Sequence, residues 1–164
     1  MYSTEGIILK KIGAGEADAL YIIYTKDFGK IRALARGVKK EGAKLKGHLE
    51  LLSLSSLSFV FGKNGEQLTQ AALLNSWPVI RQDWARLRVA TQLVAMVDRG
   101  CLEGDKDEAL WKLLLESIIF LEKNDLNKKN LDLFREEFVG RLSACLGYGN
   151  NPEDLKRANP DILV

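Results

Sequence analysis

The residues that could do chemistry in this chain are concentrated in one cationic stretch, residues 26–46. This stretch holds eight basic residues and only two acidic ones. The basic residues are Lys26, Lys30, Arg32, Arg36, Lys39, Lys40, Lys44 and Lys46. So many cations on one segment could follow the backbone of a polyanion. The same stretch could equally be an ordinary solvated surface, because positive charge also keeps edge strands from pairing with other chains.

The first half of this stretch alternates as an extended strand does. One face carries the small apolar residues Ile31, Ala33 and Ala35. The other face carries Lys30, Arg32, Leu34 and Arg36. Small side chains suit the inside of a tightly curved sheet, so we expect the cations to lie outside. Gly37 ends the strand, and a basic loop follows as far as Gly47.

Other motifs lack the partners that their chemistry requires. Residues 13–18 begin like a dinucleotide-binding fingerprint, but the third glycine is missing and the pattern that follows predicts a strand instead of a helix. His48 is the only histidine, and its His-x-Glu spacing lacks the Pro-Cys-x-x-Cys of zinc deaminases. No Cys-x-x-Cys pair occurs, which excludes a thiolate zinc site. We therefore expect a binding protein without metal, cofactor or catalysis. His48 is expected at a strand start beside the basic loop, where it could contact a phosphate.

Charge is distributed unevenly along the 164 residues, although the net charge is only +2. Residues 1–80 carry a net charge of +4 and residues 81–164 a net charge of −2. This asymmetry favours an anionic partner for the first half. The chain begins without the pattern of a signal peptide, and its most apolar window, residues 110–121, is too short to span a bilayer. We expect a cytoplasmic protein with no membrane association.

Five strands are expected in the first half, with no helix between them. They cover residues 6–12, 17–25, 30–36, 48–61 and 66–74. The fourth is apolar on both faces, which predicts a strong bend or packing on both sides. Five short strands joined by tight hairpins favour a closed barrel of the OB-fold type, whose strands two and three usually form the binding face. We place this domain at residues 1–78, with Trp77 in its buried junction.

After Pro78 the apolar period becomes helical. Helices are expected over residues 84–104, 107–123 and 131–146, with Gly147 as the C-cap of the last one. Trp84, Cys101 and Cys145 are expected in the core. Residues 150–164 contain two prolines and predict a loosely packed tail or a short terminal turn. The chain is therefore expected to be α+β, an OB-fold barrel followed by a helical domain at residues 79–164.

Several segments together resemble the RecO family of DNA-repair and recombination mediators. The most specific is Ala35-Arg36-Gly37-Val38-Lys39-Lys40, followed by Lys44-Leu45-x-Gly47-x-Leu49. Weaker matches are Gly15-Glu16-x-Asp18, Tyr24-Thr25-x-x-x-Gly29-Lys30, Ala71-x-Leu73-Leu74, Val94-x-x-x-Asp98 and Phe134-x-x-x-Phe138-x-x-x-Leu142-x-x-x-Leu146-Gly147-Tyr148. Many members carry a four-cysteine zinc site after the Leu-Gly-Tyr and continue through further helices. This chain has no cysteine there, so we expect no zinc, and it stops at Val164.

The resemblance implies binding of single- and double-stranded DNA, strand annealing, and help in loading RecA onto DNA coated by single-stranded-DNA-binding protein. It also implies RecR and the acidic tail of single-stranded-DNA-binding protein as partners. The expected phosphate contacts are Lys30, Arg32, Arg36, Lys39, Lys40, Lys44 and Lys46. Candidates for the acidic tail are Arg81, Arg86, Arg88, Arg135 and Arg141.

Two questions stay open at this level. Phe28, at a hairpin tip, could stack on a base or could fold over the barrel end. The whole chain could instead be a protein-interaction adaptor whose barrel has no direct role with DNA.

Overall fold

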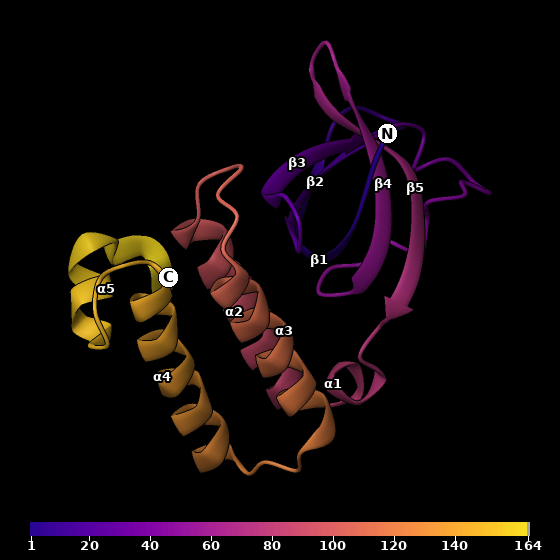
Figure 1. The fold of residues 1–164 in the computed structure, drawn as a ribbon. Helices are drawn as coiled ribbons and strands as arrows, with labels where there is room; N and C mark the ends of the chain where they lie inside the picture. The colour runs from indigo at the N-terminus through magenta and orange to yellow at the C-terminus, as the bar shows by residue number, and fades with distance from the viewer. Residues whose placement is uncertain (164) are drawn as a thin grey trace. The chain divides into compact units, whose positions relative to one another are not determined.

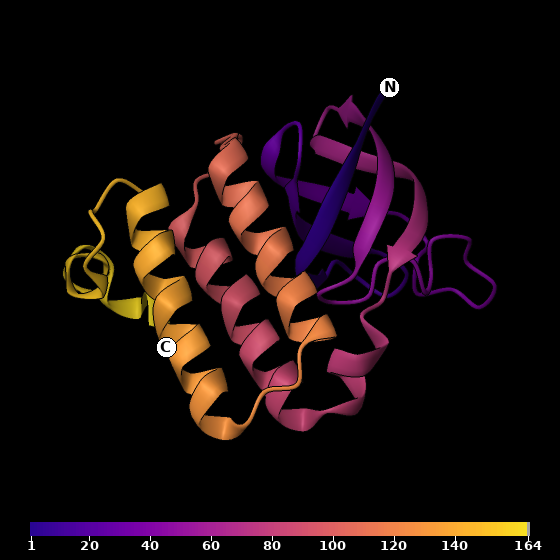
Figure 2. The ribbon, with the colours of Figure 1, turned by 60° about the horizontal axis from the view of Figure 1, so that its bottom comes forward.

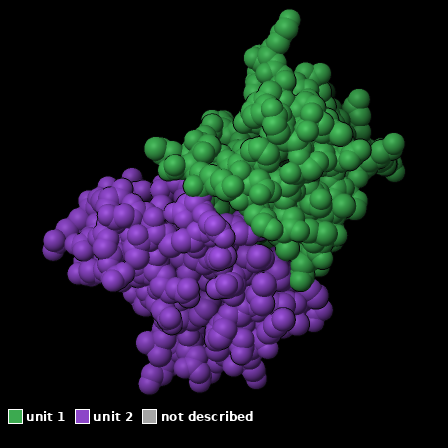
Figure 3. All heavy atoms as spheres, in the orientation of Figure 1, with its two compact units in different colours: residues 1–76, 102–106 green, residues 77–101, 107–164 purple. Residues whose placement is uncertain are grey.

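The computed structural model describes residues 1–163 and divides the chain into two compact units (Figure 3). The barrel unit consists of Met1–Ser76 together with Leu102–Lys106. The helical unit consists of Trp77–Cys101 and Asp107–Val164. The short segment Leu102–Lys106 thus belongs with the barrel, although helices precede and follow it in the sequence.

Five strands form the barrel unit (Figure 1). They are β1 (Tyr2–Gly13), β2 (Ala19–Thr25), β3 (Gly29–Ala35), β4 (Leu54–Gly62) and β5 (Gly65–Asn75). The sheet closes in the order β1-β2-β3-β5-β4. Only the β3–β5 pair is parallel; the other four pairs are antiparallel. This mixed five-stranded barrel confirms the predicted OB-like, α+β fold.

The first strand, β1, bends, and this lets it pair with β4 along its first half and with β2 along its second half. Its register with β2 shifts between Ile8 and Lys10, as a β-bulge does. Gly6 lies where β1 pairs with both neighbours, opposite Thr25 on β2 and Ser55 on β4. A Cβ on Gly6 would lie 2.6 Å from Ile23 Cγ2, so no larger residue fits without a shift. The strand begins at Tyr2, four residues before the predicted start.

The barrel core confirms the predicted inner face of β3. Ile31 is 4% exposed, and Ala33 and Ala35 are fully buried. They belong to one buried cluster with Ile8, Ala19, Tyr21, Ile23, Val38, Leu49, Leu57, Phe59 and Leu68. Two alanines on one strand allow the sheet to close tightly, since little volume has to fit inside the curve.

The predicted fourth strand was wrong in its first six residues. Residues 48–53 form turns, and β4 begins only at Leu54. Leu49 and Leu52 are nonetheless buried, and the backbone N–H of Leu52 donates to Ile8 O over 2.8 Å. Leu52 has a left-handed backbone, with φ of 76°. The apolar residues on both parities therefore come from a chain that bends beneath β1, one of the two alternatives predicted.

The helical unit contains α1 (Pro78–Gln82), α2 (Trp84–Gly100), α3 (Glu108–Lys123), α4 (Lys128–Cys145), α5 (Pro152–Ala158) and a 3₁₀ turn at Pro160–Leu163. Figure 2 shows α2, α3 and α4 as long rods. Side chains of Asp83, Asp107, Asn127 and Asn151 cap the N-termini of α2, α3, α4 and α5. No helix within residues 1–163 is long and apolar enough to cross a membrane.

The C-terminal cap at Gly147 is confirmed. Its φ is +84°, and the N–H of Tyr148 donates to Ser143 O over 2.9 Å, as in a Schellman motif. The predicted helix ending at Gly104 was too long, because α2 stops at Gly100. Helix α4, predicted to start at Leu131, starts at Lys128 instead. The Asn127 side chain accepts a hydrogen bond from Asn130 N and caps a polar first turn.

The expectation that Trp84 lies in the core was wrong, and the expectation for the tail was right in one of its alternatives. Trp84 is 79% exposed at the start of α2, whereas Trp77 is buried as predicted. Of the two alternatives for residues 150–164, the loosely packed tail is wrong, because Leu155 of α5 and Ile162 are fully buried, whereas the short terminal turn agrees with the 3₁₀ turn at Pro160–Leu163. Pro152 and Pro160 each stand at the start of a helical turn, where a missing N–H costs nothing.

Candidate nucleic-acid interface

The outer face of β3 carries the predicted row of cations. Along the strand, Lys30 is half-buried, Arg32 exposed and Leu34 half-buried, and exposed Arg36 directly follows the last strand residue, Ala35. From Lys30 to Arg36 the strand advances about 20 Å at the usual rise per residue. The strand pairs with β2 along its whole length but with β5 only at Ala33 and Leu34.

The segment Leu102–Lys106 runs along the free edge of β3. The N–H of Gly104 donates to Lys30 O over 2.8 Å, and Lys30 and Glu103 form a parallel bridge. Arg32 Nε lies 3.4 Å from Glu103 Oε1. One predicted phosphate contact is therefore paired with a carboxylate inside the barrel unit.

The basic loop, residues 37–47, is a chain of tight turns. Backbone bonds link Lys40 N to Gly37 O, Ala43 N to Lys40 O, and Lys46 N to Ala43 O, at 3.1–3.2 Å. Three glycines in it, Gly37, Gly42 and Gly47, have positive φ. Val38 is buried in the barrel core and Leu45 packs against it. These two contacts fasten a loop of otherwise exposed lysines to the barrel.

A second set of bonds ties the start of this loop to the β1–β2 turn. Gly37 N donates to Asp18 Oδ1 over 2.7 Å, and Lys39 N donates to Ala17 O over 2.9 Å. The ammonium of Lys39 also donates to Gly15 O over 2.8 Å. Lys39 therefore has a structural partner, which separates it from the other loop lysines.

Four of the predicted cations remain exposed without an intramolecular partner. Within residues 1–163, no hydrogen bond or ion pair is formed by the side chains of Arg36, Lys40, Lys44 and Lys46. We call these four the free cations. In Figures 1 and 2 the loop that carries three of them extends away from the barrel.

Two hollows adjoin two of the free cations, Arg36 and Lys44. The first, about 300 Å³, lies between Arg36, Lys44, Leu45 and residues 67–69 of β5. The second, about 360 Å³, shares Lys44, Leu45 and Thr69 with it. It adds Ser56, Ser58, Gln70, Ala71 and Ala72. Hydroxyl and amide groups beside cations are common phosphate ligands.

The charge pattern gave no signal for these uncharged polar residues. Ser56 and Gln70 come from different strands and meet only because β4 and β5 pair, with Ser58 opposite Gln70. Serines stand at positions 53, 55, 56 and 58, but nothing in the sequence placed any of them beside Lys44.

His48 holds the end of β5. Its Nδ1 accepts from Leu73 N over 3.1 Å, and its backbone oxygen accepts from Ser55 Oγ over 2.6 Å. These bonds give His48 a structural role at the start of the β4 region. Phe28 also has a structural role, because its ring packs on the barrel core and lies 5.3 Å from the Phe59 ring.

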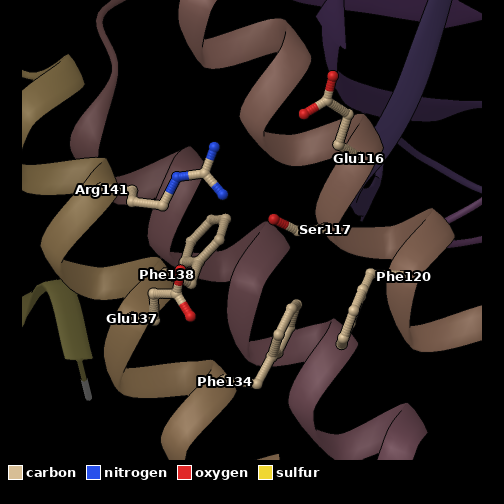
Figure 4. Close-up of a pocket in the computed structure, with 7 residues that line it drawn as sticks. All are labelled: Glu116, Ser117, Phe120, Phe134, Glu137, Phe138 and Arg141. Carbon is tan, nitrogen blue, oxygen red and sulfur yellow. The ribbon is translucent and has the colours of Figure 1, made fainter. Parts of the chain in front are cut away.

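The helical unit has its own hollow between α3 and α4, of about 260 Å³ (Figure 4). Phe120 and Phe134 stack face to face there, with centroids 5.1 Å apart and planes at 6°. The charged residues that line it are Glu116, Glu137 and Arg141. Two carboxylates and one guanidinium give the hollow a negative balance.

The candidate arginines of the helical unit differ in their surroundings. Arg86 is 7% exposed, donates to Leu121 O over 2.9 Å and pairs with Asp83 and Asp125. Arg135 donates to Gln92 Oε1 over 2.9 Å. Arg88 is exposed and Arg81 is half-buried. Arg86 therefore stabilises this unit and is not available to bind an acidic tail.

The described residues contain no group of three or more His, Cys, Asp or Glu side chains that could hold a metal ion. Both cysteines are free thiols. Cys101 is buried as predicted, and Cys145 is half-buried. Burial and the nearby Asp107 raise the pKa of the Cys145 thiol, which makes it less reactive.

Comparisons with known proteins agree with the barrel. Residues 1–77 match the family model described as Recombination protein O N terminal. The chain is 38% identical over 114 residues to a DNA repair protein RecO of Gloeobacter violaceus, covering 70% of this chain and 44% of that protein.

Two other similar proteins match over more of the chain. A DNA repair protein RecO of Acetivibrio thermocellus is 32% identical over 145 residues, 88% of this chain and 57% of that protein. One of Acaryochloris marina is 33% identical over 152 residues, 93% of this chain and 50% of that protein. The chain thus spans about half the length of the curated relatives that it matches.

Proposed function

We propose that this chain, which belongs to the RecO family of DNA repair proteins, binds DNA through the basic loop and β3 and acts as a non-enzymatic recombination mediator. One observation carries the proposal. Two of the free cations, Arg36 and Lys44, line polar hollows on a closed barrel, and the other two, Lys40 and Lys46, are exposed on the same loop as Lys44. Such a surface fits a phosphate backbone.

The proposed contacts are to the backbone, and this suits annealing. Lysine and arginine held by a barrel can neutralise phosphates while the base edges stay open for pairing. Two strands bound in this way repel each other less, because their counterions have been replaced by protein charge. The same contacts would serve single- and double-stranded DNA. Of the seven predicted contacts, Arg32 and Lys39 contribute less, because each already has an intramolecular partner.

The partners proposed from family membership are RecR and the acidic tail of single-stranded-DNA-binding protein, with RecA served indirectly, in the cytoplasm. The hollow between α3 and α4 is a poor match for an acidic tail, since Glu116 and Glu137 oppose the single Arg141. Arg86 is buried and engaged. Among the predicted arginines, exposed Arg88 is the best remaining candidate for that tail.

The test is the salt dependence of binding to a labelled single-stranded oligonucleotide, measured by fluorescence anisotropy with the full chain. Four backbone contacts predict a log–log slope near −3, at about −0.7 for each phosphate. The triple variant Lys40→Gln/Lys44→Gln/Lys46→Gln should make the slope shallower by about 2.

The matched control is Lys123→Gln/Lys128→Gln/Lys129→Gln, which removes three exposed charges from the helical unit. It should leave the slope unchanged. If the wild type does not bind at low salt, or if both triple variants change the slope equally, the DNA-binding proposal is wrong. The adaptor interpretation would then stand.

A further inference from the structure

Building on the proposed function, we propose that the barrel carries a stacking site for one unpaired nucleobase. The site is the aromatic mouth, formed by Tyr2, Phe28, Phe59 and Phe61 at one end of the barrel. Phe61 supplies the exposed ring. The free cations hold the backbone, and the aromatic mouth receives a base.

The four rings form one connected cluster. The Tyr2 ring lies 5.1 Å from that of Phe61, 5.6 Å from that of Phe59 and 5.6 Å from that of Phe28, measured between centroids. Phe59 is fully buried and Phe28 half-buried, so these two form the base of the cluster. Tyr2 is 44% exposed and Phe61 60% exposed, so these two form its rim.

The position of Phe61 explains its exposure. Leu57, Phe59 and Phe61 share one face of β4, and the first two fill the barrel core. Phe61 lies beyond the end of that core, beside the hairpin turn at residues 62–65. This turn joins strands four and five, and that loop is one of those with which OB-folds bind oligonucleotides. A large ring left in water there is available for a ligand with a flat face.

The charges around the aromatic mouth point to a base instead of a phosphate. A hollow of about 410 Å³ borders Phe28, Phe59 and Phe61. Its charged residues are Asp27, Lys30, Glu66, Glu103 and Lys106. Three carboxylates against two ammonium groups repel a phosphate. The exocyclic amino groups of cytosine, adenine or guanine could donate to such carboxylates, and any base can stack on the rings.

Strand β5 links the aromatic mouth to the hollow of Arg36 and Lys44 within the barrel unit. Glu66 lines the aromatic hollow, while its neighbour Gln67 lines the hollow that contains Arg36 and Lys44. Consecutive residues of a strand are about 3.4 Å apart. Successive side chains of a strand point to opposite faces, so the two hollows open on either side of β5. We infer that a DNA strand several nucleotides long passes around β5 from Arg36 and Lys44 to Phe61.

This arrangement predicts a preference that backbone contacts alone cannot give. A base in a duplex is already stacked and paired, so it has no face to offer to Phe61. The aromatic mouth should therefore strengthen binding to single strands and leave binding to duplexes unchanged.

The experiment compares Phe61→Ala with wild type on an oligothymidylate, on an abasic oligomer of the same length and charge, and on a duplex. Phe61→Ala should bind the oligothymidylate about 5- to 160-fold more weakly, the range expected for loss of one stacked base. Its salt slope should be unchanged. On the abasic oligomer, and likewise on the duplex, Phe61→Ala should have the same affinity as wild type.

Two controls keep the outcome interpretable. Phe61→Trp restores an aromatic ring at this position and should recover oligothymidylate binding. Recovery would show that Phe61→Ala loses affinity because it lacks the ring and not because the barrel unfolds. Leu133→Ala removes a 58% exposed apolar side chain from the helical unit and should change nothing. If Phe61→Ala binds oligothymidylate as wild type does while the triple lysine variant does not, the base site is wrong and the DNA-binding function remains. If wild type binds no DNA, both proposals fail.

Discussion

Arg32 Nε and Glu103 Oε1 lie 3.4 Å apart, joining the cationic strand β3 to the segment between α2 and α3. Both side chains are about half exposed, at 51% and 54%. A pair this exposed contributes little stability, because water screens both charges. Under the proposed function, its main effect is on DNA binding, since Glu103 lies where a phosphate would contact Arg32.

Glu103→Gln should therefore raise DNA affinity. The variant frees Arg32 and removes one negative charge beside β3, so we expect about two- to five-fold tighter binding at low salt. The gain should shrink as salt is added. Anisotropy titrations at two salt concentrations measure both effects. Glu108→Gln is the matched control, because Glu108 pairs with Lys112 on α3 and lies outside the barrel unit. Equal gains in both variants would contradict a local effect at Arg32.

Gly29→Ala tests whether the segment Leu102–Lys106 is docked on the barrel. Gly29 has φ of +66°, and a Cβ there would overlap the backbone of Asp105. We expect a loss of about 3 kcal/mol in the free energy of unfolding, from left-handed strain and the clash together. Gly42→Ala has a similar φ of +73° with open space around it, and should lose only about 1–2 kcal/mol. Urea denaturation gives both values, and equal losses would show that the segment is not docked.

Arg86→Ala should destabilise the helical unit. Arg86 is buried and donates to Leu121 O at the end of α3, where carbonyl groups lack helical partners. Loss of a hydrogen bond from a charged donor costs about 1.5–3 kcal/mol. Arg88→Ala, an exposed neighbour on α2, should stay within about 0.5 kcal/mol of wild type. Thermal or urea unfolding distinguishes them, and a neutral Arg86→Ala would refute the structural role.

Tyr21 predicts how stability falls at alkaline pH. Burial in the barrel core raises the pKa of Tyr21 above 10.0, and Glu50 raises it further. The folded state therefore holds this proton more tightly than the unfolded state does. Stability from this group is complete below pH 10 and is lost as pH rises toward the folded-state pKa.

Tyr21→Phe removes that titration and should flatten the fall in unfolding free energy above pH 10. Tyr148→Phe, which changes a 43% exposed tyrosine in the helical unit, is the control. The same alkaline slope in wild type and Tyr21→Phe would contradict the assignment. Unfolding in urea, repeated between pH 8 and pH 11, supplies the comparison.

Periodicity predicted the fold because it reports burial directly. Ile31, Ala33 and Ala35 alternate with charged residues, and that alternation was enough to place the inner face of β3. The error at residues 48–53 also arises because periodicity reports burial and not secondary structure. Leu49 and Leu52 are buried in a bend, and in the sequence this pattern looks like a strand that is apolar on both faces. Trp84 was misplaced because a helical stripe continues past the residues that pack.

The candidate site was less predictable, because charge in a sequence does not reveal its partners. Lys39 and Arg32 looked equivalent to Lys40 and Arg36, but Gly15 O and Glu103 engage the first two. Nothing in the pattern of residues 102–106 indicates their position along β3, since that contact depends on tertiary structure. Phe61 was predicted only as an apolar strand residue, and its exposure follows from where the barrel core ends.

The most direct test of the account is to map DNA binding by NMR on the ¹⁵N-labelled full chain, titrated with a short oligothymidylate. We predict that backbone amide shifts change along residues 36–47 and 67–70, around the free cations, and along residues 59–66 at the aromatic mouth. The backbone amide chemical shifts of α3 and α4 should not change. Shifts confined to the helical unit, or no shifts at all, would contradict the central claim that the basic loop and β3 bind DNA.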